Sequence, residues 1–122
     1  MKIAKVVKAY KALQEISNLP LPYKAARPLA KLKKALAEEV EVIQGMEIAL
    51  VNKYSGSIQP NGHFKFGSAE VLQKFDADHK ELMAQESEIE IKPVSLSQYT
   101  DIIRVSADTI CDLENVVDFG GD

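Results

Sequence analysis

The sequence is poor in cysteine and has no long apolar run. Of its 122 residues only Cys111 is a cysteine, which excludes a disulfide bond within the chain and fits a reducing, cytoplasmic compartment. No stretch approaches the roughly 18 consecutive apolar residues of a membrane-spanning helix. Residues 1–15 are rich in lysine and lack an apolar core, so they do not resemble a secretory signal. These absences predict a cytoplasmic protein that has no membrane segment.

Motifs for catalysis are missing as well. Gly56, Gly62 and Gly67 are spaced as turn residues and no lysine followed by serine or threonine comes after them, so they form no phosphate-binding loop. No serine lies in a nucleophile-elbow sequence. The two histidines, His63 and His79, belong to no recognised metal-binding or catalytic pattern. We therefore expect no catalytic residue, no metal site, no cofactor and no small-molecule substrate, and the protein is predicted not to be an enzyme.

Two side chains with reactive groups have competing interpretations. His79 falls on the apolar stripe of a predicted helix, which favours a packed, partly buried imidazole over a ligand. Asp76 precedes it by three residues, and the pair leaves open a hydrolase or metal site completed by distant acids. Cys111 lies beside apolar residues of another predicted helix, which indicates a buried, inert thiol.

The apolar content is sufficient for one folded domain. Apolar residues make up 46% of the chain and charged residues 27%, both ordinary for a globular protein. A chain of this length forms a single core, so one domain is predicted over residues 1–122.

Two long segments show helical spacing of apolar residues. The segment 2–17 is amphipathic, and two prolines after it stop the helix. The longest helix is predicted over about 23–54, where leucine or isoleucine recurs every seven residues in a coiled-coil-like seam, with Leu32 and Met46 at intervening positions. Pro28 predicts a kink or a restart in this helix.

The rest of the chain is predicted to form shorter elements. Two helices are expected over about 69–85 and 107–117, and strands over about 63–66, 87–92 and 102–105. In the segment 87–92 polar and apolar residues alternate, so its isoleucines should face inward and its glutamates outward. The segment 102–105 is its candidate partner strand.

Together these elements predict a mainly α fold of the α+β class. The long helix and the third helix should form an antiparallel helical hairpin, with the N-terminal helix packed alongside. A small two-stranded β element and a short C-terminal helix complete the expected architecture.

Charge is distributed unevenly along the chain. Residues 1–34 carry nine basic side chains against one acid, a net charge of +8, whereas residues 35–122 carry six against seventeen, a net charge of −11. Either the two parts neutralise each other within the fold, or the basic part meets an acidic partner.

The basic part contains one candidate binding face. Lys24, Arg27, Lys31 and Lys34 fall within an arc of about 80° on an unbroken helix. Such a face can bind an acidic protein surface or a phosphate backbone, and the alternative is a solvated helix face. The acidic chain as a whole disfavours general nucleic-acid binding, because its field repels phosphate.

Several short motifs follow one another in a familiar order. They are Leu-Pro-Tyr-Lys-Ala-Ala at 21–26, Leu-Ala-Lys-Leu-Lys-Lys at 29–34, Asn-Lys-Tyr at 52–54, Pro-Asn-Gly at 60–62, the segment 86–96 and Ile-Arg-Val-Ser-Ala-Asp at 103–108. Over nearly its whole length the chain resembles a group of small, functionally uncharacterised proteins of tailed bacteriophages and prophages. The resemblance implies a phage or prophage origin and the cytoplasm of a bacterial host, and it carries over no functional residues.

The function expected from these observations is non-enzymatic. We expect a phage or prophage accessory protein that acts through protein–protein contact, in virion assembly or host takeover. Self-association is expected, because a long helix with apolar heptads exposes more seam than two short helices cover. The alternative is a nucleic-acid-binding regulator that uses the basic helix face.

Overall fold

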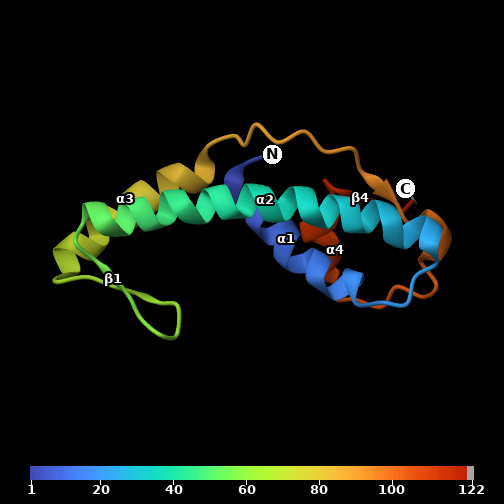
Figure 1. The fold of residues 1–122 in the computed structure, drawn as a ribbon, viewed down its shortest axis with the longest axis horizontal. Helices are drawn as coiled ribbons and strands as arrows, with labels where there is room; N and C mark the ends of the chain where they lie inside the picture. Colours follow the sequence, from blue (N-terminus) through green and yellow to red (C-terminus); the bar gives the residue numbers. More distant parts are fainter. Residues whose placement is uncertain (121–122) are drawn as a thin grey trace.

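One helix spans most of the length of the molecule. In the computed structural model, which describes residues 1–120, α2 (Tyr23–Lys53) is 31 residues long, and the other helices pack against it or its neighbours (Figure 1). The N-terminal half of α2 packs against α1 (Ile3–Ser17), and α3 (Ala69–Ala84) runs back along its C-terminal half (Figure 1). The short α4 (Ala107–Leu113) packs on α1. The prediction of a mainly α chain built on a long second helix is confirmed.

The helix α2 continues through Pro28 without a break, so of the predicted kink or restart the restart does not occur. A proline inside a helix removes the hydrogen bond to the carbonyl four residues before it, here that of Lys24. Leu29 and Leu32 directly after Pro28 are 2% and 6% exposed, and Ala25 before it is 2% exposed. Packing on both sides of the proline therefore holds the helix together across the missing bond.

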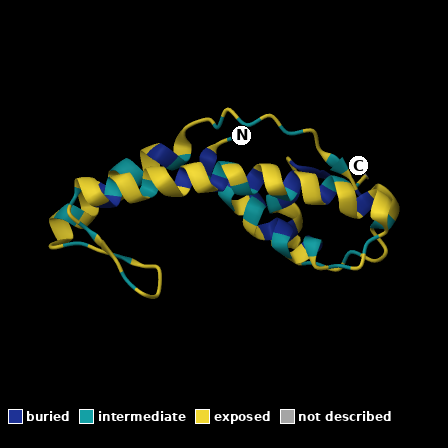
Figure 2. Ribbon diagram, in the orientation of Figure 1, coloured by how far each residue is buried: buried dark blue, intermediate teal, exposed yellow. Residues whose placement is uncertain are grey.

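The core lies where α1, α4 and the N-terminal half of α2 meet (Figure 2). Its largest fully buried members include Leu13 and Ile16 of α1 and Leu36 and Ile43 of α2. The lysines of α1 lie on the opposite, exposed face, as its amphipathic spacing predicts. The helical period of the sequence therefore determines both the buried and the exposed face of α1.

Met46 does not follow the predicted seam. The seven-residue repeat places it beside the buried leucines, yet 45% of its surface is exposed. A straight α-helix drifts by about 20° per heptad relative to a seven-residue repeat. Over the two heptads from Leu32 to Met46, this drift turns the side chain from the core to the surface.

The β structure differs from the prediction. Two short strands, β1 (Ser57–Ile58) and β2 (Phe64–Lys65), form an antiparallel hairpin with Ile58 opposite Phe64, so the expected strand 63–66 is present in shortened form. The second sheet pairs β3 (Val94–Ser95) with β4 (Val117–Asp118) in parallel. The predicted strands 87–92 and 102–105 do not form.

Residues 86–93, which we call the strap, run as an extended chain from α3 to β3 (Figure 1). Burial alternates along the strap as predicted, with Ile89 and Ile91 half-buried and Glu88 and Glu90 exposed. One isolated bridge, between Lys2 and Glu86, is its only ladder contact among the described residues. The expected partner 102–105 is instead irregular, with Ile103 and Val105 packed against the core.

The C-terminal helix is shorter than predicted, since α4 ends at Leu113 rather than at residue 117. The amide of Val116 donates to the carbonyl of Leu113, and the carbonyl of Val116 accepts from the amide of Val94. Residues after Leu113 thus enter the parallel sheet rather than a further helical turn. The prediction of a buried Cys111 is wrong, because its side chain is exposed on α4.

Candidate interaction surface

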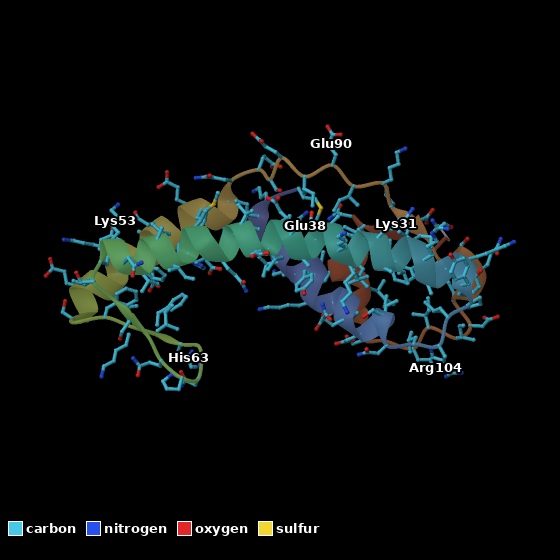
Figure 3. All side chains as sticks on the ribbon, viewed as in Figure 1. Lys31, Glu38, Lys53, His63, Glu90 and Arg104 are labelled. Carbon is cyan, nitrogen blue, oxygen red and sulfur yellow. The ribbon has the colours of Figure 1, made fainter. Side chains whose placement is uncertain are left out.

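The four predicted basic residues do share one surface. Lys24, Arg27, Lys31 and Lys34 are all exposed, and because α2 is continuous through the proline they lie on one side of a single helix. Figure 3 labels Lys31 at this basic end of α2. The structure therefore places the four residues of the predicted face on one side of α2.

Within residues 1–120 these cations have no acidic partner. None of the nine basic side chains of residues 1–34 forms an ion pair with a described residue. The contact made by the face is a hydrogen bond of 3.3 Å from Nη1 of Arg27 to the hydroxyl of Tyr23. Ion pairs within the described part of the chain therefore do not neutralise the basic segment.

The same side of α2 becomes apolar toward its C-terminal end. Val42 and Met46 are 54% and 45% exposed. Gly45 and Ala49 lie between and beyond them, also exposed, and a Cβ atom built on Gly45 meets nothing within 4 Å. The spacing of these four residues is 3, 1 and 3, which is the spacing of one helix stripe.

At 100° per residue, the basic residues and the apolar stripe fall within a common arc of about 120°. We call this surface the α2 outer face. It comprises Lys24, Arg27, Lys31, Lys34, Glu38, Val42, Gly45, Met46, Ala49 and Lys53.

Neighbouring elements border this face and leave it open. On one flank, a groove of about 510 Å³ separates α2 from the strap and β3, with Lys31 on its helix side and Glu90 on its strap side. Farther along, a groove of about 380 Å³ runs between α2 and α3, and Met46 and Ala49 line it. The outer face is therefore a helix ridge with a groove beside each half.

A polar cluster fixes the C-terminal end of the ridge, around Lys53, which we call its distal end. The Tyr54 hydroxyl donates to Oδ2 of Asp78 at 2.6 Å, and Nζ of Lys53 donates to the same oxygen at 3.1 Å. The hydrogen bond from Tyr54, followed by that from Lys53, lowers the pKa of Asp78 below its ordinary value. The hydrogen bond to Asp78 raises the pKa of Tyr54 and that of Lys53. The lysine at this end of the outer face is thus held in place by α3.

His79 is packed, as predicted, but its partner differs from the expected one. Its ring stacks on Phe75 with centroids 5.5 Å apart, and its Nε2 lies 2.8 Å from Oε2 of Glu47 on α2. Asp76 is exposed and forms no hydrogen bond with the imidazole. The missed residue is Glu47, whose side chain is 22% exposed and which follows the buried Ile43 by about one helical turn. A carboxylate on an apolar stripe is the signal that could have identified it.

Groups with metal-binding character do not converge in the described residues. Within residues 1–120 no three or more histidine, cysteine, aspartate or glutamate side chains are grouped so that they could hold a metal ion. None of the helices described is both long enough and apolar enough to cross a bilayer.

Comparisons with models of protein families, with curated protein sequences and with solved structures found no match to this chain. The surface that its own residues build is thus the basis for a functional proposal.

Proposed function

We propose that this chain is a non-enzymatic interaction protein that docks another protein on the α2 outer face. The observation that carries the proposal is the pair of half-exposed apolar side chains Val42 and Met46. Between them lies Gly45, where an added Cβ atom would meet nothing within 4 Å. Full burial of such a side chain contributes about 1.5–3 kcal/mol, so covering the exposed half of each supplies roughly 1 kcal/mol. The four exposed cations beside the stripe add orientation and a preference for an acidic partner.

The biological setting that we propose is that of a phage or prophage accessory protein in the cytoplasm of a bacterial host. The resemblance to small proteins of tailed phages supports this setting. Virion assembly and host takeover both depend on protein–protein contacts, which agrees with a docking surface and no catalytic motif.

A photo-crosslinking amino acid placed on α2 in the producing cell tests the proposal. Met46 and Ile48 are 45% and 43% exposed, and two residues apart on a helix they point about 160° away from each other. The proposal predicts a protein adduct from position 46, lost when Val42→Lys is added, and no comparable adduct from position 48. Equal labelling at the two positions, or none at position 46, contradicts it.

A nucleic-acid-binding regulator is the second candidate, favoured by the alignment of four exposed cations that form no ion pair with any other residue of 1–120. Binding of a labelled DNA duplex at low salt should weaken with salt with a logarithmic slope of about −3 to −4 if all four cations contact phosphates. Lys31→Glu should weaken binding for every sequence, whereas Lys11→Glu on α1, with the same change in net charge, should have a smaller effect. Absence of binding at low salt disproves this candidate.

A further inference from the structure

We infer that the partner docked on the α2 outer face is a second copy of this chain, packed antiparallel along α2 on a two-fold axis beside Gly45 and Met46. This inference rests on the proposed function and names its partner. It is argued from the order of residues along the ridge, the open glycine and the charges at its two ends.

The distal part of the outer face is complementary to itself when it is reversed. It begins with the exposed carboxylate of Glu38 and ends with the ammonium group of Lys53, whose side chain is 61% exposed. In an antiparallel pair about the proposed axis, Glu38 of each copy faces Lys53 of the other. The apolar residues between them face one another, Val42 opposite Ala49 and Gly45 opposite Met46. A two-fold contact requires this kind of self-complementary surface.

The glycine at the centre has no role within one copy. Gly45 lies in the interior of α2, where glycine is less favourable than alanine, and a Cβ there would meet nothing within 4 Å. The fold of the single chain therefore does not require a glycine at this position. A second helix would use it, because the absent side chain lets two backbones approach closely and gives Met46 of the other copy a place to pack.

The remaining charges also favour the antiparallel orientation. In a parallel pair, Glu38 would face its own counterpart, and so would each of the four basic residues. In the antiparallel pair, the basic half of each α2 extends beyond the C-terminal end of the other copy's α2, so the two basic faces lie at opposite ends of the dimer and their like charges do not meet.

The proposed contact between the two α2 helices is short, so we expect the dimer to be weak. From Glu38 to Lys53 the ridge is about 22 Å long at 1.5 Å per residue. An interface of this length with one helix from each side belongs to the weak, reversible class. Sedimentation equilibrium over concentrations up to about 1 mM covers that class, and we expect a monomer–dimer equilibrium.

Substitutions on α2 test the position of the interface. Met46→Lys should weaken the dimer by at least about tenfold, whereas Ile48→Lys, equally exposed on another side of the helix, should leave the dissociation constant within about twofold. Gly45→Gln is a further probe, because it raises the helix propensity of the single chain and yet blocks close approach. We expect this variant to be folded, thermally more stable as a monomer, and impaired in dimerisation.

A charge exchange tests the orientation. Glu38→Lys and Lys53→Glu, each alone, should dimerise more weakly than the wild type, since like charges then meet at both ends. Mixed in equal amounts, the two variants should form a heterodimer in which both end contacts are again between opposite charges. Circular dichroism of Lys53→Glu checks that its change beside Asp78 leaves the helices intact. Homodimers of both single variants that are weaker than the wild type, together with a heterodimer about as tight as the wild type, support the antiparallel pair. In a parallel pair each single variant would dimerise as tightly as the wild type and the heterodimer more tightly than the wild type, and this result overturns the inference.

The outcomes separate this inference from the proposed function. A chain that is monomeric over the whole range, yet is crosslinked through position 46 to another protein, overturns the second copy and leaves the docking face. A dimer that Met46→Lys and Gly45→Gln do not weaken overturns the inference as well, because its interface lies elsewhere. A monomer without any adduct at position 46 overturns both.

Discussion

At the scale of single residues, one carboxylate oxygen links the long helix to α3. Oδ2 of Asp78 accepts hydrogen bonds from Tyr54 and from Lys53. These contacts lower the pKa of Asp78 and raise the pKa of both donors. Across the neutral pH range Asp78 is therefore ionised, Lys53 is charged and Tyr54 is a neutral hydrogen-bond donor.

The stability of the protein should depend on pH through this cluster. A carboxyl whose pKa is lower in the folded state contributes stability above its unfolded pKa and loses it as the pH falls through the folded value. For Lys53 and Tyr54, whose pKa values are raised, the contribution is present below the ordinary pKa and is lost as the pH rises through the folded one. We expect Asp78→Asn to lower the unfolding temperature most at neutral pH and to flatten its decline toward about pH 2. Thermal unfolding followed by circular dichroism measures this, and an unchanged acid limb in the variant would contradict it.

Two glycines should respond in opposite directions to the same substitution. A methyl group at Gly45 meets no atom within 4 Å, so Gly45→Ala should raise the free energy of unfolding by about 0.5–1 kcal/mol. At Gly56 the added Cβ would lie 2.5 Å from Cε1 of Phe66, so Gly56→Ala should lower it by about 1–3 kcal/mol. Urea unfolding at a concentration where the chain is monomeric gives both values. A loss of stability in Gly45→Ala would show that the single chain itself needs this glycine.

At the scale of elements, the helical period predicted the bounds of the helices, which depend on local sequence. It did not predict which side chains the rest of the fold covers. The amphipathic stripes placed α1 and α2 within a residue or two of their observed bounds, because the 3.6-residue period is written in the sequence. The basic face was predicted for the same reason. Its apolar continuation was missed because Met46 fits a seven-residue repeat that a straight helix does not keep in register with its core.

The strap shows the same division between local pattern and tertiary pairing. Its alternation predicted correctly that Ile89 and Ile91 are turned inward, since the two-residue period is a property of any extended chain. The pairing with 102–105 was wrong, because a partner strand is chosen by the whole fold rather than by the segment. The residues after α4 take the neighbouring β3 as their partner instead.

Amide hydrogen exchange should reveal the unpaired strap. Among the described residues the amides of Glu88, Glu90 and Lys92 have no hydrogen-bond acceptor, whereas the amide of Ser87 donates to Met1 and that of Val94 to Val116. We expect the three unpaired amides to exchange nearly as fast as in an unfolded peptide, and Ser87 and Val94 to be protected. Exchange followed by NMR resolves these positions. Slow exchange along the strap would mean that another strand pairs with it in solution.

At the scale of the whole molecule, the chain has two hydrophobic clusters of unequal size. The main core joins α1, α4, β4 and the N-terminal half of α2, and it reaches α3 through Leu82 and the partly buried Met83. Phe75 of α3 and Val51 of α2 are buried outside that core, where the C-terminal end of α2 packs against α3. There the ring of Phe75 packs on Phe66 and Phe64, with centroid distances of 4.7 and 5.6 Å. The distal end therefore depends on a few aromatic contacts, the hydrogen bond between His79 and Glu47 and the cluster at Asp78.

The difference in size between the two clusters predicts that α3 and the C-terminal end of α2 open before the main core unfolds. Cooperative units of a protein open with free energies that follow their buried contacts, and α3 contributes only two buried side chains, Phe75 and Leu82. Phe75→Ala should remove the exchange protection of α3 while α1 keeps most of its own. Leu13→Ala, in the fully buried core, should lower the protection of α1 by about 2–5 kcal/mol and that of α3 by less, because α3 exchanges through its own opening. Native-state hydrogen exchange on both variants measures the difference. If Phe75→Ala weakens α1 and α3 equally, the chain unfolds as one unit. The part of the α2 outer face beside α3 would then be as stable as the main core.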